Sequence, residues 1–97
     1  MEIIVRIKEQ GALVEREFTN RDGNPEKFAT VPFVLTHGGD SFFAEMVQEN
    51  ARKVGSVTLS KDYYYLASLT CSVREWTDKE NKVHKEPRIV LNKLIVL

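Results

Sequence analysis

The sequence predicts an all-β domain with one short helix. Apolar residues recur at every second position in several segments, which is the pattern of strands that bury one face. Turn-forming residues separate these segments, and the connections are too short for the crossovers that parallel strands need. The strands should therefore form a mainly antiparallel sheet, in a single domain that covers residues 1–97.

The first predicted strand is long and interrupted. Ile3, Val5 and Ile7 alternate with residues that we expect on the outer face, and residues 12–19 continue the strand pattern beyond Gly11. A glycine inside a strand pattern indicates a bulge or a sharp coil. We therefore expect one strand that bends near Gly11.

A turn rich in Asn, Asp, Gly and Pro at residues 20–25 should end this strand. The second strand follows, and its inward-facing residues are Ala29, Val31, Phe33 and Leu35. Pro32 lacks an N–H group for the ladder, so it predicts an edge position or a bulge. Residues 37–40 then form the turn of a hairpin.

Residues 41–54 fit two patterns. As a strand they place Phe42, Ala44 and Met46 inward, whereas as a helix they form one apolar stripe with Asp40 or Ser41 as the cap. We predict a strand to about Met46, because it follows a hairpin turn, and then a short helix over residues 47–54. Gly55 should end that helix, before a connector over residues 56–62.

Two long strands close the chain, with a charged turn at residues 77–82 between them. The inward set of the first strand is predicted to be Tyr65, Ala67, Leu69, Cys71 and Val73. In the last strand, a bulge near Asn92 would let Ile89 and Leu91, and also the apolar residues 94–97, reach the core. Five strands with one helix between the third and the fourth match a partly open Greek-key barrel, the OB fold.

Composition narrows the possible functions. The 97 residues are 42% hydrophobic and 29% charged, which suits a small globular domain. The single cysteine, Cys71, cannot form an internal disulfide; we expect it to be buried, in a protein of the reducing cytoplasm. No segment has the run of apolar residues that spans a membrane or forms a signal peptide, so we expect no membrane association.

The sequence offers no catalytic constellation. His37 and His84 lie far apart and have no cysteine or carboxylate partners at metal-ligand spacing, so we expect no metal and no cofactor. Phosphate loops, nucleophile elbows and zinc-protease motifs are also absent. We therefore expect a binding protein rather than an enzyme.

Aromatic and basic residues mark the outer face of the last hairpin and of the first strand. Trp76 shares the outward parity of Ser72 and Arg74 at the mouth of the charged turn, where a nucleobase could stack on it. Tyr64 and Phe43 also point outward in this interpretation. The candidate phosphate-binding residues are Arg74, Lys79, Lys82, Lys85 and Arg88 on the last hairpin, with Arg6, Lys8 and Arg16 on the first strand.

The chain resembles bacterial single-stranded DNA-binding proteins and their small primosomal relatives. The similar segments are residues 1–7, 29–35, 47–54, 72–78 and 89–97. The resemblance implies an OB fold that binds single strands through aromatic and lysine side chains, and it implies a dimer or tetramer. We expect two differences from that family: the 97 residues include no tail with an acidic tip, and their 14 basic and 14 acidic residues cancel.

The leading hypothesis is a protein that binds single-stranded DNA without strong sequence preference, in replication, recombination or DNA transfer. Single-stranded RNA is a close variant, since nothing in the sequence distinguishes a protein that contacts the 2′-hydroxyl. The alternative is an OB module for protein interaction or oligomerisation, in which Trp76, Tyr64 and Phe43 bury against a partner or a second copy. Neutral net charge favours this alternative.

Overall fold

The computed structural model describes residues 1–97 and contains six strands and one short helix. The elements are β1 (Glu2–Gln10), β2 (Val14–Thr19), β3 (Pro25–His37), β4 (Asp40–Val47), α1 (Gln48–Val54), β5 (Tyr65–Thr77) and β6 (Val83–Val96). The predicted class, all-β with one short helix, is confirmed. With its seven residues, α1 is too short to cross a membrane, and the structure has no other helix.

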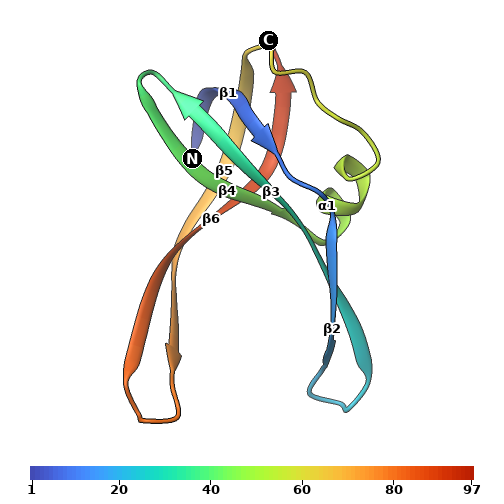
Figure 1. Ribbon diagram of the computed structural model, residues 1–97, viewed down its shortest axis with the longest axis vertical. Coiled ribbons are helices and arrows are strands. Elements are labelled where there is room, and N and C mark those ends of the chain that lie inside the picture. Colours follow the sequence, from blue (N-terminus) through green and yellow to red (C-terminus); the bar gives the residue numbers. More distant parts are fainter.

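The strands close into a ring (Figure 1). The order is β1-β5-β6-β4-β3-β2, and an additional pairing of β1 with β3 completes the circuit. All pairs are antiparallel except β4 with β6. Because β1 and β2 both pair with β3, they act as one interrupted strand, as the sequence predicts. When β1 and β2 are counted as one strand, the ring has five strands, the number that the sequence predicts for a Greek key.

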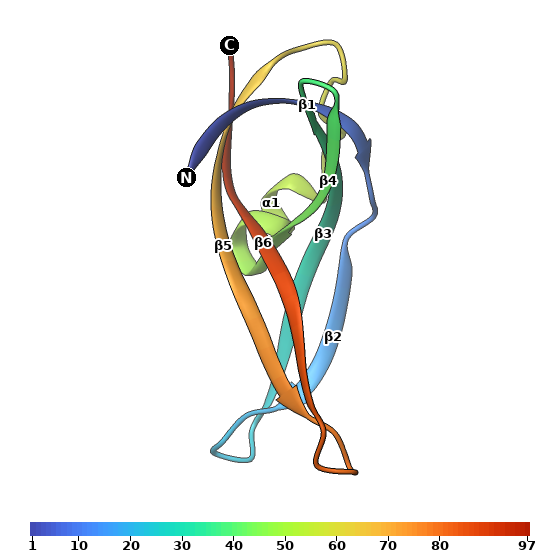
Figure 2. The same ribbon diagram turned by 90° about the vertical axis from the view of Figure 1, so that its left-hand side faces the viewer.

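The core fills the ring and contains only hydrophobic residues. The predicted alternation is confirmed in β1, β3 and β4, where the buried side chains all lie at the inward parity. The largest fully buried side chains are Phe33, Leu35, Leu91, Val5 and Val31. One end of the ring is covered by α1, which contributes Ala51 and Val54 to the core (Figure 2).

The interruption between β1 and β2 depends on Gly11. Its N–H donates to the Pro32 carbonyl at 2.8 Å. A Cβ at this position would lie 2.4 Å from Pro32 Cγ, so no larger residue fits without displacement. Pro32 itself lies in the interior of the sheet, opposite this interruption, so the alternative of an edge position is wrong. Its missing N–H falls where the ladder is already broken.

Replacing Gly11 with alanine is expected to lower the free energy of unfolding by about 1–3 kcal/mol, because the added methyl overpacks against Pro32. Thermal unfolding followed by circular dichroism measures this loss. Gly39→Ala is the matched control, since a Cβ there meets no atom within 4 Å. Equal stability of the two variants would contradict the packing argument.

The β4–α1 boundary agrees with the predicted strand and helix to within one residue. Gln48 adopts a left-handed φ of 53°, which turns the chain from strand to helix. Its side-chain oxygen accepts a hydrogen bond from the Ala29 N–H at 3.2 Å and thereby offsets part of this strain. Gly55 follows the helix as predicted, and its N–H donates to the Ala51 carbonyl at 2.8 Å.

Two hairpins extend beyond the core as arms (Figures 1 and 2). We call residues 14–30 the β2–β3 arm and residues 70–90 the β5–β6 arm. Every residue of β2 is exposed, and so is every residue from Thr70 to Thr77 in β5. Beyond Ala29, which belongs to the core, the arms are held together by backbone ladders rather than by buried side chains.

Two residues of the β5–β6 arm that were predicted to lie in the core are exposed instead. Cys71 is exposed, and the side chain of Val73 is 65% exposed, although both keep the inward parity of Leu69. Alternation continues along the strand, but the pair of strands has left the body, so no layer covers that face. The expectation of a buried cysteine is therefore wrong.

The predicted bulge near Asn92 is confirmed. Ser68 pairs with Lys93 and Leu69 pairs with Leu91, which leaves Asn92 unpaired between them. Leu94 packs against the core as expected. Residues 95–97 are exposed, contrary to the prediction, because they lie on the outer face or beyond the end of the ring.

Candidate nucleic-acid interface

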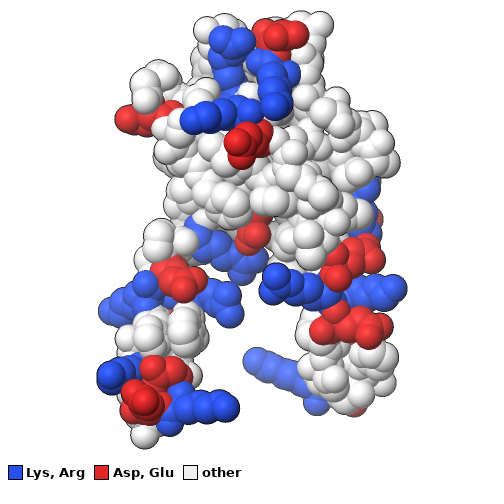
Figure 3. Space-filling view, in the orientation of Figure 1, with Lys and Arg blue, Asp and Glu red and all other residues white.

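A groove of about 800 Å³ lies between the two arms. Its lining comes from β2, β3, β4, β5 and β6, so segments far apart in the sequence meet there. In Figure 3, Lys and Arg side chains project from both arms into the space between them.

Strand register brings the lining residues onto common faces. Arg16 lies directly opposite Phe28, and Arg74 lies directly opposite Glu86. Residues that face each other across an antiparallel pair point to the same side of the sheet. Phe43 and Glu45 of β4 continue the same outer surface beside β3. The groove thus presents three arginines, two phenylalanines and two glutamates.

Arg88 lies at the base of the groove. Its guanidinium carbon is 6.0 Å from the centre of the Phe28 ring, which is a cation–π contact between β6 and β3. Its Nε lies 3.3 Å from Glu45 Oε1, close enough for an ion pair but outside hydrogen-bond geometry. The Nε–H group is therefore buried without a hydrogen-bond acceptor, and the Glu45 carboxylate is its ionic partner.

Arg16 and Arg74 form no ion pair and donate no side-chain hydrogen bond. They come from different arms, one on each side of the groove. Guanidinium groups in this condition can bind phosphate oxygens in bidentate fashion without first losing a partner. Because three arginines and two glutamates line it, the groove has an excess of one positive charge, whereas the whole chain is neutral.

Trp76 lies near the tip of the β5–β6 arm, two residues from Arg74 and on the same face. Its ring stacks on His84, with centroids 4.1 Å apart and planes inclined by 14°. The residue is 39% exposed, so the indole keeps an accessible surface. The predicted outward direction of Trp76 is confirmed, and the stack on His84 is an addition that the sequence analysis missed.

The predicted lysines of this arm lie outside the groove lining. Lys82 pairs with Glu80 and Lys85 pairs with Glu75, each at 3.6 Å. The Glu75–Lys85 pair occupies the face opposite to Arg74 and Trp76. Lys79, in the turn, has no ion pair. These residues surround the arm tip rather than line the groove.

Arg6, Lys8 and Tyr64 lie on β1 and just before β5, away from the arm tips (Figure 1). The Arg6 guanidinium sits 5.3 Å from the Tyr64 ring centre and donates to the Lys61 carbonyl at 3.2 Å. Lys8 lies at the irregular pairing between Ile7 and Glu9. The structure therefore separates these three predicted residues from Arg16, Phe43, Arg74 and Arg88, which it brings together.

The sequence analysis missed several residues of the groove face. Phe28 and Phe18 could have been found, because Phe28 has the parity of the outward set in its strand and Phe18 has the same parity as Arg16. Phe18 is 42% exposed and extends the groove face of the β2–β3 arm towards its tip. Glu45 and Glu86 carry no such signal, since single glutamates on outer faces are common.

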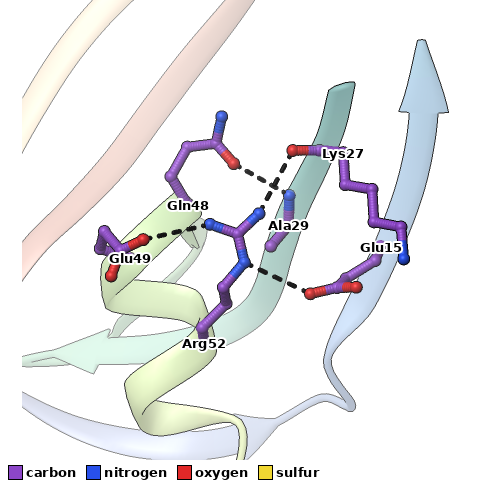
Figure 4. Close-up of polar contacts among 6 residues, drawn as sticks. All are labelled: Glu15, Lys27, Ala29, Gln48, Glu49 and Arg52. Carbon is purple, nitrogen blue, oxygen red and sulfur yellow. Dashed lines mark hydrogen bonds and ion pairs between the residues drawn. The ribbon is translucent and has the colours of Figure 1, made fainter. Parts of the chain in front are cut away.

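The base of the β2–β3 arm is tied to α1 through Arg52 (Figure 4). The guanidinium contacts Glu15 at 3.3 Å and Glu49 at 3.4 Å, and it donates to the Lys27 carbonyl at 3.2 Å. Glu15 and Lys27 are the chain neighbours of Arg16 and Phe28. The helix thereby helps to fix the position of one wall of the groove.

No family model matches the chain, and no curated protein matches it either. No group of three or more His, Cys, Asp or Glu side chains is placed to hold a metal ion. The chemistry of the groove is that of aromatic rings and guanidinium groups, which suits binding of an anionic, planar ligand.

Proposed function

We propose that the protein binds single-stranded DNA, without strong sequence preference, in the groove between its two arms. The observation that carries this proposal is the groove itself, where three arginines and two phenylalanines from both arms and the ring surface converge. Single strands need such a combination, because phosphates bind to guanidinium groups while bases stack on aromatic rings.

The place of the groove on the fold supports the proposal. OB folds bind oligonucleotides on the face of their second and third strands, between two long hairpin loops. Here those strands are β3 and β4, which supply Phe28 and Phe43, and the two arms are the corresponding hairpins. The ring topology also supports the resemblance to single-stranded DNA-binding proteins, and we propose membership of that group on this basis.

Duplex DNA is a poor fit because its bases are already stacked on one another and cannot reach the aromatic rings. Single-stranded RNA stays an alternative ligand, since it offers the same phosphates and free base faces. We place the function in replication, recombination or DNA transfer in the cytoplasm, where the exposed thiol of Cys71 stays reduced.

Fluorescence anisotropy of labelled oligo-dT, about 30 nucleotides long, tests the proposal at about 50 and 200 mM salt. We expect micromolar or tighter binding that weakens with salt, because each neutralised phosphate releases counterions. Matched duplex should bind much more weakly. Emission of Trp76, the single tryptophan, should change in the same titration. Absence of binding at low salt would refute the function.

A second candidate is an interaction module that pairs with another protein or a second copy, as a dimer or tetramer. The observation in its favour is exposed apolar surface: Phe43 is 59% exposed, and Val73 and Val83 share the far face of the β5–β6 arm. Sedimentation of wild type and of Trp76→Ala separates the candidates. If the protein is an interaction module, the substitution changes the oligomeric state, and neither the wild type nor the variant binds oligo-dT.

A further inference from the structure

The turn at the tip of the β5–β6 arm is organised by the carboxylate of Asp78. One oxygen, Oδ1, accepts hydrogen bonds from the N–H groups of Glu80 at 2.8 Å and Lys82 at 2.9 Å. The other, Oδ2, lies 2.7 Å from His84 Nε2. These contacts, with the His84 bond the largest cause, lower the pKa of Asp78. An ionised carboxylate is acceptor-only, so Nε2 must carry the proton.

Asp78 therefore fixes the orientation of the imidazole, and the imidazole in turn covers one face of Trp76. The two rings lie 4.1 Å apart and nearly parallel. His84 and Trp76 are directly opposite in the β5–β6 ladder, on the face that carries Arg74 into the groove. With one face of the indole covered by the imidazole, the exposed remainder of the ring lies on the strand face that carries Arg74, beyond the lining of the groove itself.

We propose, building on single-strand binding, that His84 is a positioning residue that holds Trp76 as a stacking platform for a nucleobase, and that protonated His84 favours binding over neutral His84. A charged imidazole strengthens the contact with Asp78 and adds a cation beside the strand. It also binds the indole face by a cation–π interaction. All three effects of protonation favour binding of the strand.

The charged groups around His84 come from the turn and from the next cross-strand pair of the arm. Asp78 is its direct partner, and the next cross-strand pair on this face is Arg74 with Glu86. In the turn, Lys82 and Glu80 pair with each other. Because the pKa of Asp78 is lowered, its carboxylate stays ionised over the range in which histidines titrate. Affinity should therefore rise as the pH falls from about 8 to about 5.5.

The stack can be tested in the free protein, without nucleic acid. A protonated imidazole in contact with an indole quenches its fluorescence by accepting an electron from the excited ring. Emission of Trp76 should therefore rise between about pH 5.5 and 8 in the wild type and stay flat in His84→Phe. Circular dichroism over the same range controls for unfolding. A flat profile in the folded wild type would overturn the arrangement.

Binding of oligo-dT by two variants then tests the role in recognition. His84→Ala should lower the affinity roughly threefold to tenfold at pH 8, because Trp76 loses its support and a base stacks less well on a mobile ring. His84→Phe keeps an aromatic ring against the indole, so at pH 8 it should bind within about twofold of the wild type. Both variants should lose the dependence on pH.

The outcomes separate this inference from the proposed function. A wild type that binds oligo-dT equally well at both pH values, or a His84→Ala variant that binds as the wild type does, would overturn the role of His84 alone. So would an unchanged pH dependence in His84→Phe. A wild type that binds no strand at either pH would overturn the proposed function together with this inference.

Discussion

The double variant Arg16→Glu with Arg74→Glu is expected to bind oligo-dT roughly a hundredfold more weakly, or worse, than the wild type. Each arginine lies on one arm, lines the groove and has no ion pair in the free protein. A hydrogen bond to a charged group contributes about 1.5–3 kcal/mol, and reversal adds repulsion from the phosphates. Anisotropy titrations at several salt concentrations measure the loss.

The salt dependence gives a second readout of the same variant. Each phosphate contact contributes about 0.7 to the slope of log K against log salt for a single strand, so two lost contacts should flatten the slope by about 1.4. Arg6→Glu with Lys8→Glu is the matched control, because it reverses two charges on β1, away from the groove. Equal losses in both double variants would show that net charge, rather than the groove, governs binding.

Truncation of Phe33 to alanine is expected to have the largest effect on stability. The side chain is 1% exposed and is among the largest that are fully buried. Loss of such a phenylalanine costs about 3–5 kcal/mol, because a cavity replaces packed atoms. For a domain of this size the midpoint of thermal unfolding should fall by about 15 °C or more. Calorimetry or circular dichroism measures the shift.

Phe43→Ala removes the same side chain from the neighbouring strand but from its outer face. Because Phe43 is 59% exposed and lines the groove, its loss should change the free energy of unfolding by at most about 0.5 kcal/mol. Affinity for oligo-dT should fall by roughly fivefold or more, since base stacking contributes about 1–3 kcal/mol. A stability loss like that of Phe33→Ala, or unchanged binding, would contradict the assigned positions.

The body of the fold was accessible from the sequence because each strand there has one buried and one exposed face. Ile7, Val31 and Ala44 lie at inward parity, and all three are buried as predicted. Cys71 has inward parity too, but it lies beyond the end of the body. Periodicity identifies which face of a strand a residue occupies, whereas the presence of a covering layer depends on the length of the strand relative to its neighbours.

The candidate site was partly accessible for the same reason. Parity placed Arg74 and Trp76 on one outer face, which the register of β5 with β6 confirms. The association of Arg74 with Arg16 and Phe28 depends on closure of the ring and on the way the two arms leave it. Those features arise from pairings between distant segments, for which local sequence carries no signal. Without those pairings, the sequence could not show that Arg16 lines the groove whereas Arg6 does not.

The open ends of the two arms have a topological consequence. The tips belong to separate turns, at residues 20–24 and 78–82, and the space between the arms stays open in Figures 1 and 3. A polymer that occupies the groove can therefore enter it sideways, at any point along its length. No threading from a free terminus is needed, so a closed circle or an internal gap is as accessible as a loose end.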